Sequence, residues 1–344
     1  MSVITVVGSG MMGSALSVPA CDNGHEVRLV GTHLDREIIA SLQADRFHPT
    51  LKRTLPEGIK AFQLEEIQEA LAGSDVVICG VNSFGVEWFG EKILPLIPGH
   101  IPVLAVTKGL RERGNGELEP FPHYWQGLVE NRLSINAIGG PCTSYELADR
   151  RQTWVYFCGD DPEVLRKLKE LLETDYYHVS TSTDVIGIEA AVALKNAYAL
   201  GVSFAVGLQE REFGIGCTPA YNPQAGLFGQ AAMEMTRLVR FLGGSDESIN
   251  VGLGDLYVTI FGGRNRKLGT LLGRGLSMQE ALEELKGLTL ESLMIITTAA
   301  SALRKLAQRG LASLEEYPLL RHMDEVINQD RPVSIPWKEF TRTV

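Results

Sequence analysis

Cysteine is scarce and irregularly placed in this chain of 344 residues. The five cysteines, Cys21, Cys79, Cys142, Cys158 and Cys217, are odd in number, and no two of them form a C-x-x-C pair. That pattern argues against a disulfide framework and against a cysteine-based zinc site. It indicates reduced thiols in a cytoplasmic protein, and we expect no metal centre.

Positive charge is also in short supply. Lys and Arg number 32 against 42 for Asp and Glu, which gives a formal net charge of −10. A protein that binds nucleic acid needs an extended basic surface to match the phosphate backbone, so nucleic acid is not an expected partner. The first residues, MSVITVVGSG, lack the basic flank and cleavage site of a signal peptide, so none is expected.

Long hydrophobic runs are nearly absent. Only residues 185–208 are long and apolar enough to span a bilayer. This run holds Glu189, Lys195 and Asn196 near its middle, and a central lysine alone costs ~2.5–3.5 kcal/mol on insertion scales. We therefore expect a buried helix in a soluble domain and no membrane insertion.

The first half of the chain alternates strand-like and helix-like segments. Apolar runs bounded by Gly, Pro or Asp recur, with amphipathic stretches between them, and the later runs lie at 75–81, 101–109, 134–141 and 153–160. This alternation predicts a Rossmann-like, doubly wound parallel sheet with helices on both faces. The chain also exceeds the usual length of one core.

Beyond about residue 183 long helical patterns take over. We therefore predict two domains: an α/β dinucleotide-binding domain at 1–183 and an all-α substrate and catalytic domain at 184–344.

The segment VVGSGMMG places Gly8, Gly10 and Gly13 in G-x-G-x-x-G spacing at the end of the first predicted strand. The first glycine permits a tight turn, the second lets backbone approach a pyrophosphate, and the third lets the helix pack on the strand. The pyrophosphate would lie at the helix N-terminus, where Met11 and Met12 begin the helix. This context predicts a dinucleotide site.

The end of the second predicted strand bears on the choice of dinucleotide. No acid stands directly after it, where a carboxylate normally binds the ribose 2′-hydroxyl. Thr32, His33 and Arg36 would donate hydrogen bonds to a 2′-phosphate, although Asp35 and Glu37 stand among them. We expect NADP(H) to be preferred, with NAD(H) possible.

Three later segments carry polar side chains on apolar backgrounds. Lys108 directly follows a predicted strand, at the edge where doubly wound sheets bind ligands, and it also fits a surface turn. Lys195 and Asn196 lie within the most apolar helix. A buried Lys195 amine would have a lowered pKa, suited to exchanging a proton with a substrate, whereas a side chain that reaches solvent would have no such role.

The third segment, GLGDLYVTIFGGRNRK, collects cations after paired glycines in an acidic protein. A local anion site and a solvated surface turn both fit this stretch when it is taken alone. In the anion site, arginine would hold the oxygens of the ligand in a bidentate fork.

Five segments together resemble NAD(P)-dependent glycerol-3-phosphate dehydrogenases, most closely the bacterial and archaeal biosynthetic type. They are, in order, VVGSGMMG, VTKG, GGPCTSYELA, EAAVALKNAYAL and GLGDLYVTIFGGRNRKLG, and the likeness extends to about residue 310. The resemblance implies reduction of dihydroxyacetone phosphate to sn-glycerol 3-phosphate for glycerophospholipid synthesis. It also implies a homodimer, and a fold similar to that of 6-phosphogluconate dehydrogenase.

The resemblance further implies individual roles. Lys195 would be the general acid/base, Asp255 would hold its amine with Thr259 nearby, and Lys108 would contribute to catalysis. The residues expected to bind substrate are Lys108, Gly140, Cys142, Lys195, Asn196, Asp255, Thr259, Arg264 and Asn265. Besides the glycine-loop and ribose-loop residues, the expected cofactor contacts are Ser83, Lys108, Ser144, Arg264 and Glu291.

The chain departs from the family pattern at several places. Cys142 stands where members usually have Ser or Thr, which replaces a hydroxyl by a weaker thiol. The Glu-Gly cofactor element aligns best at Glu291, with Lys286-Gly287 as a competing alignment. A related 3-hydroxyacid or ketopantoate dehydrogenase, or a dinucleotide-binding sensor without turnover, stays open as an alternative.

Overall fold

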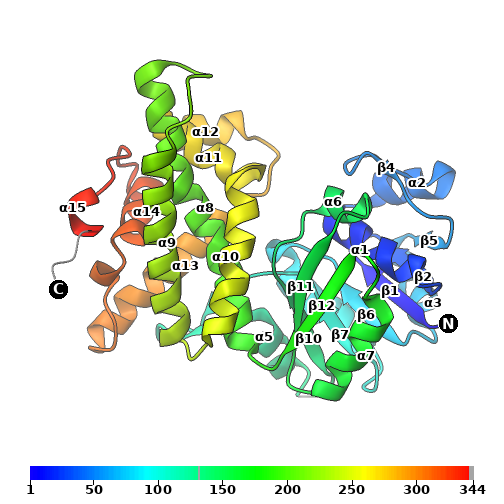
Figure 1. The fold of residues 1–344 in the computed structure, drawn as a ribbon. Coiled ribbons are helices and arrows are strands. Elements are labelled where there is room, and N and C mark those ends of the chain that lie inside the picture. Colours follow the sequence, from blue (N-terminus) through cyan, green and yellow to red (C-terminus); the bar gives the residue numbers. More distant parts are fainter. Residues whose placement is uncertain (131, 341–344) are drawn as a thin grey trace. The chain divides into compact units, whose positions relative to one another are not determined.

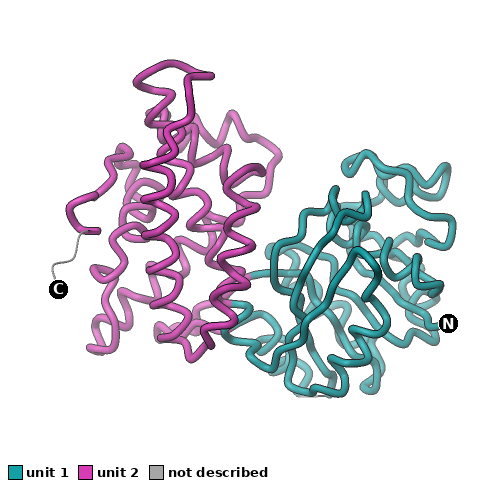
Figure 2. The backbone as a smooth tube through the Cα atoms, in the orientation of Figure 1, with its two compact units in different colours: residues 1–108, 120–189 teal, residues 109–119, 190–344 magenta. Residues whose placement is uncertain are grey.

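The computed structural model describes residues 1–130 and 132–340, and its internal contacts divide the chain into two compact units (Figure 2). Unit 1 comprises residues 1–108 and 120–189, and unit 2 comprises residues 109–119 and 190–344. The division therefore falls inside a helix, a few residues beyond the change of pattern in the sequence. The excursion of 109–119 into unit 2 has no counterpart in the sequence-based domain prediction.

Unit 1 is built on one eight-stranded sheet, accompanied by a two-stranded sheet (Figure 1). The strands of the large sheet are β1 (Val3–Val7), β2 (Glu26–Val30), β5 (Ile59–Phe62), β6 (Val76–Cys79), β7 (Val103–Ala105), β10 (Ile135–Gly139), β11 (Thr153–Cys158) and β12 (Tyr177–Ser182). The small sheet pairs β3 (Phe47–His48) with β4 (Arg53–Thr54).

Helical segments connect these strands. The helices are α1 (Met11–Asp22), α2 (Arg36–Asp45), α3 (Ile67–Leu71), α4 (Val86–Trp88), α5 (Phe121–Leu128), α6 (Ser144–Ala148) and α7 (Pro162–Leu172). Shorter turns are η1 (Leu64–Glu66), η2 (Ser83–Gly85), η3 (Phe89–Ile93) and η4 (Leu94–Leu96).

The strand order of the large sheet is β12-β11-β10-β7-β6-β1-β2-β5. The six strands from β5 to β10 are parallel and follow the doubly wound order, in which β2 and β5 lie on one side of β1 and β6, β7 and β10 lie on its other side. β11 runs antiparallel to β10 and pairs with β12 in parallel, so the sheet is mixed and not wholly parallel as predicted. The crevice where such sheets bind ligands lies at this change of side, beyond the carboxyl ends of β1 and β6.

The central strands are buried on both faces. In β6, Val76 and Ile78 belong to the core shared with α1, α2, α6 and α7, whereas Val77 and Cys79 belong to the core shared with α3, α4 and α5. Because successive side chains of a strand point to opposite faces, this apolar run packs helices on both faces of the sheet. The fold class is thus the predicted Rossmann-like one.

Unit 2 is helical apart from one short hairpin that joins β8 (Leu110–Glu112) to β9 (Leu118–Pro120). Its helices are α8 (Val185–Phe213), which begins in unit 1, α9 (Tyr221–Phe241), α10 (Asp246–Ile260), α11 (Gly263–Arg274), α12 (Met278–Glu284), α13 (Glu291–Gln308), the turn η5 (Leu314–Glu316), α14 (Pro318–Gln329) and α15 (Trp337–Phe340). The hairpin is held to α13 by an ion pair between Lys305 and Glu112.

Helix α8 is the core of unit 2. Among the described residues it is the one helix long and apolar enough to cross a membrane, and 83% of its most apolar window is buried inside the protein. Its apolar composition is therefore that of a helix in the core of the protein.

Glycines let neighbouring helices approach α8 closely. A Cβ on Gly252 of α10 would lie 2.5 Å from the Cβ of Ala191, and one on Gly269 of α11 would lie 2.2 Å from the carbonyl oxygen of Leu200. Only glycine fits at these contacts, so the sequence brings α10 and α11 against the polar middle of α8.

Candidate active site

The glycine loop between β1 and α1 has the geometry of a dinucleotide cradle. Gly8 has φ +109°, and a Cβ on Gly13 would lie 2.1 Å from the carbonyl oxygen of Gly8, so both positions need glycine for the fold itself. A Cβ on Gly10 would instead meet nothing within 4 Å. Gly10 is the N-cap residue of α1, and no side chain of the described residues caps the helix. The first amides of α1 can therefore donate hydrogen bonds to an anion.

A further glycine, at the end of β6, completes this loop. A Cβ on Gly80 would lie 2.6 Å from the carbonyl oxygen of Gly8. The segments that directly follow β1 and β6 can therefore approach each other this closely only because both positions are glycine. Sequence reasoning missed this residue because it lies far along the chain from the fingerprint.

The loop after β2 is organised by Asp35. Its Oδ2 accepts hydrogen bonds from the Thr32 amide at 2.9 Å, from the Thr32 hydroxyl at 2.8 Å and from the Ser9 amide at 3.3 Å. The His33 ring lies 5.7 Å from the ring of Trp88, and Arg36 forms an exposed ion pair with Glu65. The Asp35 carboxylate of this loop is thus bonded to two backbone amides and one hydroxyl group of the protein itself.

Several further candidates lie beyond the carboxyl ends of β6, β7 and β10. Lys108 Nζ donates to the carbonyl oxygen of Gly140 at 3.2 Å, and Cys142 is half-buried beside the core. Ser144 is buried as the first residue of α6. Ser83 is buried in η2, and its hydroxyl has no hydrogen-bond partner within the described part of the chain. Because parallel strands end at one edge, these residues share the edge that carries the glycine loop.

Glu189, near the start of α8, is a buried carboxyl group that the sequence analysis used only as an argument against membrane insertion. Neither of its oxygens has a hydrogen-bond partner among residues 1–130 and 132–340. Burial raises the pKa of Glu189 to about 8, against the stabilising charge of Lys108. At neutral pH this carboxyl group is therefore largely protonated.

In unit 2, Lys195 lies between two side chains of α10. Its Nζ is 2.9 Å from Asp255 Oδ1 and 3.0 Å from Thr259 Oγ1, and its side chain is 13% exposed. Thr259 donates its own hydroxyl hydrogen to the Asp255 carbonyl, one helical turn earlier, at 2.7 Å. The hydroxyl oxygen is thereby oriented to accept from the ammonium. The close approach at Gly252 places these groups within reach of α8.

Asn196, the residue after Lys195, belongs to a chain of hydrogen bonds between three helices. Asn265 Nδ2 of α11 donates to Asn196 Oδ1 at 2.9 Å, and Asn196 Nδ2 donates to Glu291 Oε2 of α13 at 3.3 Å. The Ser292 amide in turn approaches Asn265 Oδ1 at 3.4 Å. Residues of three helices that are far apart in sequence, α8, α11 and α13, are thus fixed side by side.

The N-terminus of α11 is rich in unneutralised positive charge. It begins after Gly262, has no side-chain cap and has no acid in its first turn, although acids are the residues that favour this position. Arg264 and Arg266 form no ion pair within the described residues, and Arg266 Nε is buried without an acceptor there. Cations at the positive end of a helix dipole raise the local potential, so this end of α11 suits an anion.

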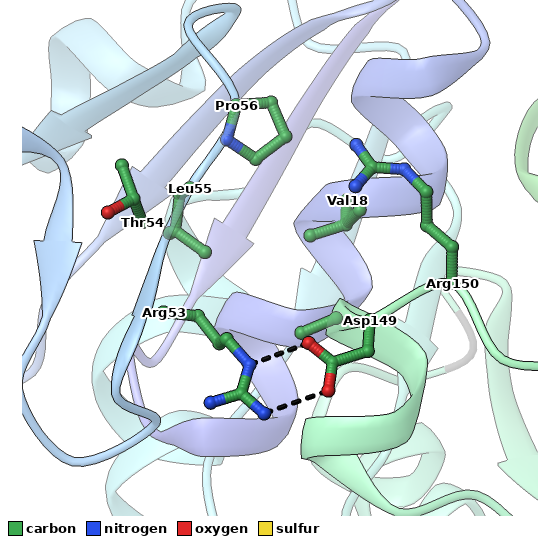
Figure 3. Close-up of a pocket in the computed structure, with 8 residues that line it drawn as sticks. Val18, Arg53, Thr54, Leu55, Pro56, Asp149 and Arg150 are labelled. Atoms are coloured by element: carbon green, nitrogen blue, oxygen red, sulfur yellow. Dashed lines mark hydrogen bonds and ion pairs between the residues drawn. The ribbon is translucent and has the colours of Figure 1, made fainter.

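One cavity of about 420 Å³ lies elsewhere in unit 1 (Figure 3). Its lining residues are Val18, Arg53, Thr54, Leu55, Pro56, Ala148, Asp149 and Arg150. Arg53 is bonded to Asp149 through two parallel hydrogen bonds of 2.6 and 2.8 Å, and Arg150 is paired with Asp22. The predicted site residues are not among those that line it, and both guanidinium groups are already neutralised.

Comparison with known proteins places both halves of the chain. Residues 3–165 match the family model described as NAD-dependent glycerol-3-phosphate dehydrogenase N-terminus, and residues 184–337 match the model of its C-terminus. The chain is 38% identical over 286 residues to the NADP(+)-dependent glycerol-3-phosphate dehydrogenase of Archaeoglobus fulgidus, covering 83% of this chain and 84% of that protein. The chain belongs to the NAD(P)-dependent glycerol-3-phosphate dehydrogenase family.

Other members of the family agree with this placement. The glycerol-3-phosphate dehydrogenase [NAD(P)+] of Shouchella clausii is 30% identical, with 89% of this chain and 88% of that protein covered. The crystal structure of glycerol-3-phosphate dehydrogenase from Coxiella burnetii superposes with a TM-score of 0.79 at 25% identity, covering 98% of this chain and 97% of that one. A ketopantoate reductase from Ralstonia eutropha shares the fold, with a TM-score of 0.58 at 14% identity and coverage of 98% and 99%.

Proposed function

We propose that this protein catalyses the NAD(P)H-dependent reduction of dihydroxyacetone phosphate to sn-glycerol 3-phosphate. The observation that carries the proposal is the placement of Lys195 between Asp255 and Thr259, beside the cation-rich N-terminus of α11. Membership of the family supports it independently. We assign dinucleotide binding to unit 1 and the substrate and its proton donor to unit 2.

The residues of unit 1 fit a dinucleotide. The open space at Gly10 and the uncapped start of α1 favour the pyrophosphate, with Met11, Met12 and Gly13 supplying the first amides. We infer that Ser83, Lys108 and Ser144, at the same sheet edge, contact the cofactor further along its length. The bound dinucleotide supplies the hydride.

We infer a preference for NADP(H), with NAD(H) as the weaker cofactor. The relative with 38% identity is named NADP(+)-dependent, and here Asp35 already accepts from Thr32 and Ser9. A 2′-phosphate would be met by His33 and by Arg36 once Arg36 leaves Glu65. That ion pair is exposed to solvent and adds little stability, so its loss is a small cost.

We assign the substrate phosphate to the N-terminus of α11. Arg264 would hold two of its oxygens in a bidentate fork, and Asn265 and the first amides of the helix would bind the remainder. Arg266 joins this set because its buried Nε lacks an acceptor in the described protein. Arg264 would also reach the cofactor, and we assign Glu291, which orients Asn196, to the cofactor side as well.

The chemistry needs one proton besides the hydride. As the hydride adds to C2 of the ketone, the C=O bond electrons move to oxygen, and Lys195 gives its proton to this alkoxide. Asp255 and Thr259 hold the ammonium for the transfer, and Lys195 regains a proton from solvent afterwards. Lys108 and Asn196 would bind substrate oxygens. Gly140 and Cys142, in the loop whose Gly140 carbonyl accepts from Lys108, would also contact the substrate.

A paired assay tests the substrate and the cofactor together. Purified protein is given NADPH or NADH with dihydroxyacetone phosphate, ketopantoate or a small oxo-acid, and nucleotide oxidation is followed by absorbance. We expect turnover with dihydroxyacetone phosphate, faster with NADPH than with NADH. Turnover of ketopantoate alone would refute the phosphate assignment, and tight NADPH binding without turnover of any ketone would favour the sensor.

We further infer a setting for this activity. The net charge of −10 and the buried α8 favour a cytoplasmic enzyme that neither binds nucleic acid nor inserts into a membrane. The product fits a role in glycerophospholipid synthesis. A homodimer is our proposal for its assembly, and the molar mass in solution tests it.

A further inference from the structure

His48 contacts the glycine loop from a distant part of the chain. It lies in β3, is fully buried, and places its Nε2 at 2.8 Å from the carbonyl oxygen of Ser9. The Leu51 amide donates to its Nδ1 at 3.0 Å. Because an amide N–H only donates, Nδ1 accepts and Nε2 must carry the ring hydrogen. One neutral tautomer satisfies both contacts.

The contact falls on the peptide that directly precedes the start of α1. Ser9 stands between Gly8 and Gly10, so its carbonyl group and the Gly10 amide belong to one planar trans peptide. The two groups of such a peptide point in opposite directions. Fixing the Ser9 carbonyl toward His48 therefore fixes the Gly10 amide away from it, on the opposite side of the loop.

Two other contacts hold the same residue. Ser14 Oγ donates to the Ser9 carbonyl at 3.1 Å, and the Ser9 amide donates to Asp35 Oδ2 at 3.3 Å. Asp35 also holds Thr32 in the ribose loop. The glycine loop is thus tied to the β2–α2 loop by Asp35 and to the β3–β4 hairpin by His48.

We propose that His48 is a positioning residue that sets the orientation of the Ser9–Gly10 peptide for dinucleotide binding. The inference rests on the dinucleotide site proposed above. His48 is buried under the loop and acts through Ser9 and not on the ligand. Its loss would leave the Ser9 carbonyl with the Ser14 hydroxyl as its remaining donor, so the Gly10 amide would be held less firmly and ordering it would become part of the cost of binding.

The same geometry makes binding dependent on the charge of the ring. An imidazolium would present a second N–H, at Nδ1, to the Leu51 amide, and two donors would then face each other. Burial lowers the pKa of His48, with the Ser9 carbonyl and the carboxylate of Asp35 acting in the opposite direction. Because this pKa is lowered, the neutral ring, and with it the ordered loop, persists below the ordinary histidine pKa of 6.5 and is lost only as the pH falls further.

Two substitutions separate the contact from the bulk of the ring. His48→Gln keeps an amide donor with a reach similar to that of Nε2, whereas His48→Asn has a shorter side chain that loses the Ser9 carbonyl. The matched control is His322→Asn in α14, which removes another buried ring, one that accepts from the Ser334 amide at 3.1 Å in unit 2. The dissociation constants of NADH and NADPH are measured by fluorescence for each folded variant at pH 8.

We expect His48→Asn to weaken the binding of both dinucleotides by roughly three- to tenfold, as for the loss of one buried hydrogen bond. The KM for dihydroxyacetone phosphate and kcat at saturating NADPH should change little, because the substrate end is untouched. His48→Gln should recover most of the affinity, and His322→Asn should keep it. Equal affinities in wild type and His48→Asn, or equal losses in Asn and Gln variants, would overturn the inference.

The pH dependence of NADH binding gives a second measurement that needs no asparagine variant. NADH lacks the 2′-phosphate, whose own titration complicates NADPH near pH 6. We expect the NADH affinity of the wild type to stay constant between pH 7.5 and 6.5 and to fall as the pH is lowered further toward 5, and the affinity of His48→Gln to fall less. Identical profiles would contradict the role of the ring. Failure of the wild type to bind either dinucleotide would instead refute the proposed cofactor site.

Discussion

The two units arrange their candidate sites by different means. In unit 1 the cradle is made of backbone: Gly8, Gly13 and Gly80 pack so closely that no side chain fits, and Gly10 leaves open space above the start of α1. In unit 2, Gly252 and Gly269 serve instead the close packing of helices. Gly252 brings α10 close to α8, and the working groups are then side chains such as Lys195.

The difference shows how each kind of site tolerates change. A backbone cradle binds what every dinucleotide shares and depends on the absence of side chains. A side-chain cluster depends on each member and on the packing that brings distant helices together. Substitutions in unit 2 should therefore affect the chemical step and substrate choice, and those in the glycine loop should affect cofactor binding or the fold.

The largest effect is expected from Lys195→Ala. Removing the proton donor should lower kcat by about 10²- to 10⁴-fold, while the NADPH dissociation constant stays near the wild-type value. Steady-state NADPH oxidation measures kcat, and fluorescence titration measures the NADPH dissociation constant. Lys60→Ala, at an exposed lysine paired with Glu26, serves as the control and should retain full activity. Substantial turnover by Lys195→Ala would remove this residue from the catalytic role.

Arg264→Ala should weaken substrate binding more than it slows the chemical step. Two charge-assisted hydrogen bonds at ~1.5–3 kcal/mol each imply a fall of at least tenfold in kcat/KM for dihydroxyacetone phosphate. The matched control is Arg240→Ala, which removes an exposed arginine paired with Asp246. An unchanged kcat/KM in Arg264→Ala would mean that the phosphate binds elsewhere.

A pair of glycine substitutions sharpens the account of unit 1. In Gly13→Ala the new Cβ would overlap the carbonyl of Gly8, so the free energy of unfolding should fall by ~1–3 kcal/mol. In Gly10→Ala the Cβ enters open space, so the protein should fold almost as stably, while NADPH binds about tenfold more weakly because the methyl occupies the place of the pyrophosphate. Thermal unfolding and NADPH titration measure the two effects. Unchanged NADPH affinity in Gly10→Ala would argue against the cradle.

The smallest effect concerns Glu189. Its raised pKa means that the folded protein keeps a proton which the unfolded chain releases above its ordinary pKa near 4.5. Its contribution to stability is therefore present at low pH and is lost as the pH rises toward 8. Glu189→Gln should flatten the fall of Tm between pH 5 and 8 by several degrees, relative to Glu57→Gln at an exposed site. Parallel curves would mean that Glu189 ionises normally.

The fold was largely predictable because its signals are local. Alternating apolar runs predicted the α/β half, and the glycine fingerprint directly after the first strand predicted the cradle. β5 is only four residues long and β12 is an edge strand of mostly polar residues, so neither could be recognised from the sequence alone. The antiparallel direction of β11 depends on how the chain crosses the sheet, which no local pattern encodes.

The site was less predictable for the same reason. Lys195 and Asp255 lie 60 residues apart in sequence but 2.9 Å apart in space, and only the family resemblance connected them beforehand. Gly80 and His48 carry no local motif, because a single glycine or histidine in a short strand is common. Asp35 was noted as an ambiguous acid, and its bonds to Ser9 and Thr32 depend on the folded loop.

One product analysis addresses the account most directly. The protein is incubated with dihydroxyacetone phosphate and NADPH that carries deuterium on the transferable position of C4, and the product is examined by NMR and mass spectrometry. The account predicts glycerol 3-phosphate with one deuterium at C2 and its phosphate intact. Product without the label at C2, or no phosphorylated product at all, would contradict it.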